Sequence, residues 1–407
     1  MSNEKVFSKD SYNFQLKSGV KPPLEFALDN YLTFACRHKF CREVCPVYQA
    51  TGNEGYIPYG FHTSLLALYK GIAKFEELGE MFVNCLYCGA CQIRCPNTLF
   101  MGDFYKVTLT TIDLVRKIRG DLAKSGVVYL GLEDAKKEVE NHLSTVDNKD
   151  VMLKWTSDLN LQIGGKKDIV LYVTRFMATQ DTKTARLCAK LLQKAGVDFA
   201  VMPTTYAGIS EPFDIGREDL FVQLAKQDID MLKEMEAKIV IITDPHDYFY
   251  FKRDYPKIFG DLPFDIVFIT EFLWRLIEDG KLKPVNEIKK KVAFHDPCTL
   301  NKLTGHWESP RKIISNIPGI EFINENHIDQ WYYCCGNGVS ITLRKAKPKL
   351  AQEIGLKRLT RVNDLGVSTL VLACPHCWDH FTEIETKTGI RIELINVIEL
   401  LAKSVGV

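Results

Sequence analysis

The stretch CLYCGACQIRCP, residues 85–96, carries Cys85, Cys88, Cys91 and Cys95, and a proline follows the last of them. This spacing is the bacterial-type ligand pattern for an iron–sulfur cubane, in which the fourth cysteine commonly binds a second cluster. The first three thiolates can converge on one cube and the fourth points away, so the run predicts a partner motif elsewhere. Structural zinc is the alternative, but zinc sites do not use such a triple run with a trailing Cys-Pro.

A second cysteine run, Cys36-x4-Cys41-x3-Cys45-Pro46, supplies that partner. Because the fourth cysteine crosses over, two ligand sets are expected: Cys45, Cys85, Cys88 and Cys91 at a [4Fe-4S] cubane, and Cys36, Cys41 and Cys95 at the other site. The pattern provides only these three cysteine ligands for the other site. His38 is a candidate fourth ligand that would raise the reduction potential, although it equally fits a solvated residue of a basic stretch. A [3Fe-4S] cluster there is the alternative to a second [4Fe-4S] cluster.

The segment between the two runs has a helical pattern. Apolar residues recur at three- and four-residue steps over residues 63–82, and the first two residues of that range are candidate caps. A small β-rich ferredoxin has a much shorter gap between its motifs, so we predict an α-helical ferredoxin domain over residues 1–110. Residues 111–165 continue as a helical connector, with one candidate helix over residues 110–125.

From residue 166 onward, short β-branched runs alternate with amphipathic helical stretches, which predicts a parallel sheet. The same order of strands occurs a second time, and such an internal repeat indicates two homologous units. We therefore predict two α/β modules, residues 166–288 and 289–407. Their expected strands are residues 169–173, 199–202, 239–242 and 266–269 in the first module, and 292–294, 320–323, 370–372 and 392–395 in the second.

The turns of the two modules also correspond, but only the second module keeps its cysteines. Asp244-Pro245-His246-Asp247 occupies the position of Cys374-Pro375-His376-Cys377, and Tyr206-Ala207-Gly208 occupies that of Cys334-Cys335-Gly336. Carboxylates are hard ligands and suit an iron–sulfur cluster poorly, so Asp244 and Asp247 are expected to make at most a hydrogen bond at the module interface. Cys188 lies on the apolar face of a predicted helix and is expected to be a small buried hydrophobe.

Five cysteines of the second module follow predicted strands or lie in a glycine-containing turn: Cys298, Cys334, Cys335, Cys374 and Cys377. Loops at one edge of a parallel sheet can converge, and five thiolates exceed the four that structural zinc needs. A zinc site on four of them is one alternative. A redox dithiol formed by Cys374 and Cys377 alone is another. His295 could donate a hydrogen bond to a cluster sulfur, or it could simply end its strand.

The bulk composition is that of an ordinary globular protein. The chain has 407 residues, 46% hydrophobic and 25% charged, and a net charge of +1, so nothing favours nucleic acid or strong binding to lipid. No apolar run reaches the length of a membrane span, and no signal peptide is expected. Metal thiolates among the 13 cysteines indicate a reducing cytoplasm, with peripheral association at the inner face of the membrane as an option.

The second module resembles the cysteine-rich CCG domains of the heterodisulfide reductase catalytic subunit. The matching pieces are His295-Asp296-Pro297-Cys298, Ser309-Pro310-Arg311 to Ile317-Pro318-Gly319, Cys334-Cys335-Gly336 and Cys374-Pro375-His376-Cys377. With the helical ferredoxin, the whole layout is similar to the fused form of that reductase and to the iron–sulfur subunits of anaerobic glycerol-3-phosphate dehydrogenase and glycolate or lactate oxidases. The expected fold class is α plus α/β, an α-helical ferredoxin domain followed by two repeated α/β CCG-type modules with parallel sheets.

The resemblance implies a non-cubane [4Fe-4S] cluster on Cys298, Cys334, Cys335, Cys374 and Cys377, and electron exchange with a flavoprotein, either an FAD-dependent dehydrogenase or an electron-transfer flavoprotein. In heterodisulfide reductase two such clusters flank the disulfide, whereas the first module here lacks all five cysteines. We therefore expect an electron-transfer subunit with a quinone or disulfide acceptor. A catalytic disulfide reductase subunit and a zinc-stabilised scaffold subunit are the alternatives.

Overall fold

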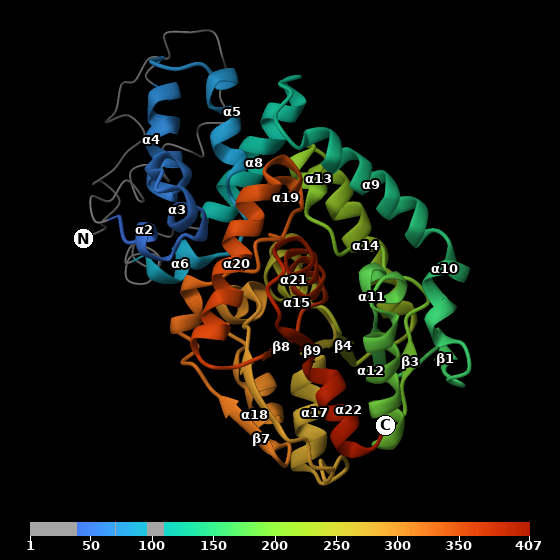
Figure 1. The fold of residues 1–407 in the computed structure, drawn as a ribbon. Coiled ribbons are helices and arrows are strands. Elements are labelled where there is room, and N and C mark those ends of the chain that lie inside the picture. The colour runs from blue at the N-terminus through green and yellow to red at the C-terminus, as the bar shows by residue number, and fades with distance from the viewer. Residues whose placement is uncertain (1–38, 70, 96–109) are drawn as a thin grey trace, which may run out of the picture.

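The N-terminal part of the chain is helical and ferredoxin-like, as expected. The computed structural model describes residues 39–69, 71–95 and 110–407, which Figure 1 draws as a coloured ribbon. Its first helices are α2 (Cys41–Val44), α3 (Pro46–Thr51), η2 (Glu54–Tyr56), α4 (Pro58–Tyr69), α5 (Phe75–Val83) and α6 (Ala90–Arg94). The described cysteines of both runs therefore lie in or directly beside short helices, close to turns of the backbone.

The helical pattern predicted over residues 63–82 is confirmed, but it is divided between two helices. Two helices, α4 and α5, occupy this range, and the turn between them contains Gly71 with a φ of 66°, which a helix does not allow. Helix α5 begins after Lys74, which caps it. Thr63 is not a cap, because α4 already begins at Pro58 and the Thr63 hydroxyl donates to carbonyls within α4. The apolar pattern continues across the break and so does not reveal it.

The connector consists of α8 (Thr111–Lys124), α9 (Leu132–Val146), α10 (Lys149–Leu153) and η3 (Lys154–Thr156). Helix α8 confirms the helix predicted over residues 110–125. Its N-cap is Thr110, whose Oγ1 accepts from the backbone N–H of Asp113 at 3.3 Å while the Asp113 carboxylate accepts from the Thr110 backbone. This capping box satisfies two donors that would otherwise lack partners at the helix start.

Two parallel sheets follow, as the alternation of strands and helices predicts. The first sheet has the order β1 (Gln162–Ile163), β3 (Ala200–Val201), β2 (Ile169–Tyr172), β4 (Ile239–Ile242) and β5 (Asp265–Phe268). The second sheet has the order β7 (Ile320–Ile323), β6 (Lys290–Phe294), β8 (Thr369–Leu372) and β9 (Glu393–Asn396). Apart from the short strand β1, which was not predicted, the strands of both sheets are arranged in the same way, with the second strand in sequence at one edge.

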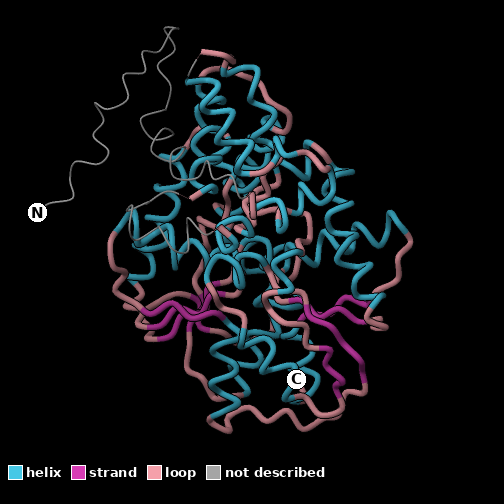
Figure 2. The backbone as a smooth tube through the Cα atoms, turned by 90° about the vertical axis from the view of Figure 1, so that its left-hand side faces the viewer, coloured by secondary structure: helices cyan, strands magenta, loops and turns pink. Residues whose placement is uncertain are grey.

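Helices pack between the two sheets. Figure 2 shows the sheets in magenta on either side of a group of helices. Four of these helices contact one another: α12 (Thr182–Lys194), α17 (Ile269–Glu278), α18 (Glu308–Asn316) and α22 (Val397–Val405). The contact of α12 with α22 corresponds to that of α18 with α17. Each pairs the helix that precedes strand β3 or β7 of one sheet with the helix that follows the last strand of the other sheet. Cys188 is fully buried in α12, as predicted.

The remaining helices cover the carboxyl edges of the strands and the outer faces: α11 (Arg175–Thr179), α13 (Glu211–Asp214), α14 (Glu218–Glu234), α15 (Pro245–Phe249), η4 (Tyr250–Asp254), α16 (Tyr255–Phe259), η5 (Thr299–Leu303), η6 (Asp329–Tyr332), α19 (Thr342–Ala346), α20 (Pro348–Asp364) and α21 (Pro375–Thr388). One hydrophobic core runs from the N-terminal helices through the first sheet into the second. Among the described residues, we find no helix long and apolar enough to cross a membrane.

Candidate metal centres

The structure brings all five cysteines of the second sheet together. Cys298 precedes η5 after strand β6, Cys374 caps α21 after strand β8, and Cys377 lies in the first turn of α21. Side-chain hydrogen bonds join Cys298 to Cys334, Cys334 to Cys335, Cys335 to Cys377 and Cys377 to Cys374. None of the five is more than 8% exposed. A buried chain of five soft sulfur donors fits an iron–sulfur cluster better than one tetrahedral ion.

Cys334 occupies the centre of this chain. Hydrogen bonds from the thiols of Cys298 and Cys335 lower the pKa of Cys334 well below its ordinary value. Hydrogen bonds with neighbouring thiols, and after them desolvation, raise the pKa of Cys335 and of Cys377. Cys334 therefore lies between Cys298 and Cys335, in the middle of the five thiols that would hold the cluster.

The turn that carries the paired cysteines depends on Gly336. This residue has a φ of 89°, and a Cβ atom there would lie 2.1 Å from the carbonyl oxygen of Ala351. The Cys335 carbonyl is itself approached closely by Gly355, where a Cβ would lie 2.3 Å away, and it pairs with His380 Nδ1 at 2.8 Å. A side chain at either glycine would displace the two cysteines, which explains the glycine after the Cys-Cys pair.

A buried ion pair holds the turn at Cys298. Arg311 donates through both terminal nitrogens to the Asp296 carboxylate, each at 2.5 Å, and Asn301 donates to the same carboxylate at 3.0 Å. Such a two-pronged contact fixes the geometry of both partners. Asp296 and Arg311 belong to the two motifs singled out in the sequence, so their joint role is to orient the loop that presents Cys298.

His295 lies beside the sulfurs. One of its ring nitrogens and the sulfurs of Cys335 and Cys377 lie within 4.8 Å of one another. Burial lowers the pKa of His295 to about 3, so the ring is neutral and carries one N–H. Its Nδ1 is buried and has no hydrogen-bond partner among the described residues. This placement suits a hydrogen bond to a cluster sulfur, the role considered for His295 from the sequence.

The N-terminal cysteines also gather. The thiol of Cys91 interacts electrostatically with those of Cys88, Cys85, Cys41 and Cys45. Cys45, between α2 and α3, interacts with Cys88 and Cys85, so the structure brings cysteines of the two runs together. Burial raises the pKa of Cys88 to about 11, whereas Cys45, Cys85 and Cys91 are half-buried.

The second predicted ligand set can be followed only in part. Cys41 lies at the start of α2, close to Cys91, and Cys95 ends α6, which packs against α2. Cys36 and His38 lie outside the described residues. Whether they complete that site therefore stays a prediction.

Comparison with known proteins agrees with this division of the chain. Residues 292–382 match the family of cysteine-rich CCG domains, and residues 34–99 match the family of 4Fe-4S dicluster domains. The chain joins an iron–sulfur dicluster domain to a CCG domain. It is 25% identical over 389 residues to a subunit of the dihydromethanophenazine:CoB–CoM heterodisulfide reductase of Methanosarcina barkeri, over 90% of this chain and 92% of that protein.

Two further matches bear on the chain. The EtfAB:quinone oxidoreductase of Syntrophomonas wolfei is 25% identical over 313 residues, which are 73% of this chain and 42% of that protein. The crystal structure of a hypothetical protein from Helicobacter pylori has a TM-score of 0.54 at 10% identity, over 94% of this chain and 76% of that one. The latter match shows likeness of fold alone.

The cysteine loop of the dicluster domain packs directly against the cysteine loops of the CCG domain. The backbone N–H of Val339 donates to the carbonyl of Leu86 at 3.0 Å. Gly89, with a φ of 72°, leaves no room for a side chain, because a Cβ there would lie 2.1 Å from Leu303 Cδ2. Cys88 and Cys334 are close enough to interact electrostatically. The sequence did not indicate this contact, since more than 200 residues separate the two loops.

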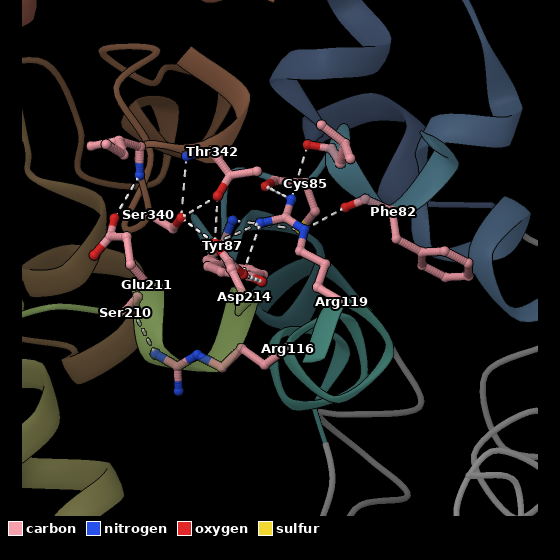
Figure 3. Close-up of polar contacts among 12 residues, drawn as sticks. Phe82, Cys85, Tyr87, Arg116, Arg119, Ser210, Glu211, Asp214, Ser340 and Thr342 are labelled. Carbon is pink, nitrogen blue, oxygen red and sulfur yellow. Dashed lines mark hydrogen bonds and ion pairs between the residues drawn. The ribbon is translucent and has the colours of Figure 1, made fainter. Parts of the chain in front are cut away.

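A buried network centred on Asp214 fixes this arrangement. Figure 3 shows its carboxylate between side chains of the dicluster domain, the connector and the CCG domain. Tyr87, inside the first cysteine run, donates to Asp214 Oδ1 at 2.6 Å. Thr342 donates to Oδ2 at 2.6 Å, and Ser340 donates to the same oxygen. Asp214 is fully buried, so these contacts form in a medium where hydrogen bonds are strong.

Arg119 of helix α8 completes the network. Its guanidinium pairs with Asp214 at 3.3 Å and donates to the carbonyls of Phe82, Val83 and Cys85 at 2.9, 2.9 and 2.7 Å (Figure 3). The positive charge therefore lies next to the first cysteine of the run. No sequence signal marked Arg119 or Asp214, because they lie in helices α8 and α13, which carry no motif.

The corresponding edge of the first sheet is filled by protein groups. Asp228 accepts from the backbone of Tyr206 and Ala207 at 2.7 and 3.0 Å, and Tyr172 donates to Asp228 at 2.5 Å. Tyr172 also contacts Asp247 at 3.1 Å. These carboxylates and hydroxyls close the place that cysteines occupy in the CCG domain.

Asp244 lies at the interface between the two sheets, as the sequence led us to expect. Its carboxylate pairs with His376 Nε2 at 3.3 Å, and His246 stacks on His376 with ring centroids 4.5 Å apart and planes 8° from parallel. Imidazole lone pairs lie in the ring plane, so two stacked rings cannot both direct them at one ion. The trio therefore serves the contact between the modules rather than a metal.

Proposed function

We propose that this chain is the electron-transfer subunit of an oxidoreductase complex, which exchanges electrons with a flavoprotein partner and delivers them to, or takes them from, a quinone or disulfide acceptor. The observation that carries the proposal is the direct contact between the cysteine loops of the dicluster and CCG domains, through Leu86 with Val339 and Gly89 with Leu303. Two redox sites this close form one path.

The proposed ligands follow from the assembled thiols. A [4Fe-4S] cubane would be held by Cys45, Cys85, Cys88 and Cys91. The second N-terminal cluster would be held by Cys36, Cys41 and Cys95, with or without His38. A non-cubane [4Fe-4S] cluster would be held by Cys298, Cys334, Cys335, Cys374 and Cys377. Iron–sulfur clusters supply one-electron transfer when bound. The chain's own residues hold the two ends of the path at a fixed separation through the Asp214 network.

The relatives support the choice of partners. One is named as a heterodisulfide reductase subunit, and the name of the other couples EtfAB to quinone. A disulfide reductase that uses two CCG-type clusters is disfavoured, because Asp228, Asp247 and Tyr172 fill the matching edge of the first sheet. The first sheet is best explained as a repeat of the CCG module, residues 166–288, that has lost its metal and now supports residues 289–407.

Metal analysis of anaerobically purified protein tests the proposal. About 11 to 12 irons per chain with matching sulfide are expected, against about 7 to 8 irons and one zinc if the CCG site is structural. Cys335→Ala should lose about four irons, whereas the matched variant Cys188→Ala, at a buried cysteine outside every ligand set, should lose none.

Electron paramagnetic resonance tests the path itself. In the fully reduced protein, the signals of the dicluster and CCG sites should be broadened by each other, because their ligand loops touch. Cys335→Ala should remove that broadening while it leaves the N-terminal signals in place. Signals that merely add, with no mutual broadening in the wild type, would contradict the relay.

A further inference from the structure

Lys302 is an unusual residue within this contact. It lies in η5, on the turn that follows Cys298, and it is 4% exposed. In the described part of the chain it is the one buried lysine. Its Nζ donates to the carbonyl of Tyr333 at 2.6 Å, directly before Cys334. The next residue, Leu303, packs against Gly89 of the dicluster domain. The ammonium group is thus enclosed where three cysteine-bearing loops meet.

The charge of Lys302 has no carboxylate partner. Across the described ranges, no aspartate or glutamate oxygen comes within 4 Å of its Nζ, whereas each buried arginine has one. Those pairs are Arg116 with Asp254, Arg119 with Asp214, Arg311 with Asp296 and Arg358 with Glu325. A buried charge without a counter-charge is strongly destabilising, so an anion must be supplied by something other than a carboxylate.

The groups that surround Lys302 indicate which anion this is. Lys302 is close enough to interact electrostatically with Cys88 of the dicluster domain and with Cys298 and Cys334 of the CCG domain. His295, which also faces it, is neutral. The negative charge available there is therefore that of the iron–sulfur groups that these cysteines would hold, because binding to the metal keeps their sulfurs ionised.

We infer that Lys302 is the shared counter-ion of the two adjoining iron–sulfur sites, and that its charge raises both reduction potentials and weakens the repulsion between an electron on one site and an electron on the other. The inference rests on the proposed function. Adding an electron makes a site more negative, and a fixed cation between the sites stabilises each reduced form. Both sites can then hold electrons at the same time.

Potentiometric titration under anaerobic conditions, followed by electron paramagnetic resonance, tests this inference with three variants. Lys302→Met removes the charge and keeps the length of the side chain, and Lys302→Arg keeps the charge. Lys290→Met, on the same strand-and-turn segment but at the far end of strand β6 and paired with Glu393, is the matched control.

Lys302→Met should lower the equilibrium constant for one-electron reduction of each site by about tenfold or more. A tenfold change corresponds to a decrease of about 59 mV in the midpoint potential of each site. The separation between the two midpoint potentials should widen. Lys302→Arg and Lys290→Met should stay near the wild type. If Lys302→Met retains full iron and both potentials match those of Lys290→Met, the inference is overturned while the relay stands.

Iron content separates the remaining outcomes. Loss of iron from the CCG site in Lys302→Met, with full retention in Lys302→Arg, would support a counter-ion role, because charge alone distinguishes the two variants. Loss in both would show that Lys302 acts through packing, which overturns the inference. A wild type that lacks iron at the CCG site, or lacks mutual broadening of its signals, would instead refute the proposed function.

Discussion

Replacing Asp214 by asparagine should weaken the whole molecule, because one carboxylate joins four parts of the chain. Both of its oxygens are fully buried and accept from Tyr87, Thr342, Ser340 and Arg119. The Asp214→Asn side chain has nearly the same shape but no charge. One of its two positions becomes an NH2 group, which donates and therefore faces existing donors.

The expected loss can be estimated from the geometry. At the 3.3 Å that separates Arg119 from Asp214, Coulomb attraction amounts to about 5 kcal/mol for an effective dielectric constant of about 20. Removing one partner of a buried pair typically costs about 3–5 kcal/mol. The three carbonyls that Arg119 also contacts remain, and the hydroxyls of Ser340 and Thr342 can turn to accept. We therefore expect the free energy of unfolding to fall by about 3–4 kcal/mol.

Urea unfolding of the iron-loaded protein measures this loss. The transition is followed by far-ultraviolet circular dichroism and by the visible absorbance of the iron–sulfur sites, and the shift in midpoint is multiplied by the m-value. Asp219→Asn is the matched control. Asp219 is 67% exposed and pairs with the exposed Arg217, so its replacement should leave the urea midpoint close to that of the wild type.

A decrease of less than about 1 kcal/mol for Asp214→Asn would refute this reasoning. It would mean that Arg119 finds enough compensation from the carbonyls of Phe82, Val83 and Cys85. An equal decrease in the free energy of unfolding for Asp214→Asn and Asp219→Asn would also refute it, since the reasoning depends on the burial of Asp214.

Three further predictions follow from the same structure. Glu211 is buried, accepts from the backbone N–H of Ile341 at 2.9 Å, and has a pKa raised by burial from 4.5 to about 7. The folded protein therefore binds the proton more tightly than the unfolded chain, so the free energy of unfolding should fall by about 3 kcal/mol as the pH rises from about 4.5 to about 7. Urea midpoints measured across this range should show the decline in the wild type and its loss in Glu211→Gln. An equal slope in both proteins would exclude Glu211 as the source of the decline. Gly89→Ala should lower the free energy of unfolding by about 1–2 kcal/mol for the left-handed backbone and by about 1–3 kcal/mol for the clash with Leu303. In a double-mutant cycle, adding Leu303→Ala should recover only the stability lost to the clash. Equal losses of stability with and without Leu303→Ala would argue against the clash. Gly336→Ala should lose about four irons per chain by metal analysis, because the new Cβ meets the backbone of Ala351. The control Gly366→Ala has the same left-handed backbone but open space around it, and it should keep these irons. Retention of iron in both variants would show that the turn at Gly336 adapts.

Much of the fold could be predicted from the sequence because local patterns carry it. The ends of strands β2 to β5 in the first sheet and β6 to β9 in the second lie within two residues of the expected ranges. The helical pattern over residues 63–82 was correct, but it did not reveal the break at Gly71, since apolar periodicity continues through that turn. Strand β1 was missed because two residues carry no periodicity, and its existence depends on pairing with Ala200 and Val201.

The candidate sites divide in the same way. Cysteine spacing alone predicted which thiols would gather, and the structure assembles the described members of the sets at Cys45 and at Cys334. Cys36 and His38 remain predictions because they lie outside the described residues. Spacing reports on ligands because a cluster holds its cysteines at short, recurrent intervals in the chain.

The sequence by itself thus determined the metal chemistry, the helical ferredoxin domain and the alternation that makes parallel sheets. Tertiary structure alone decided that the loop of Cys88 touches the loops of Cys298 and Cys334, that Asp214 joins Tyr87 to Thr342, and that Lys302 is buried without a carboxylate. The physical reason is distance along the chain. The cysteines of a ligand motif lie within a few residues of one another, whereas the neighbours of a buried charge are separated from it by more than a hundred residues of the chain.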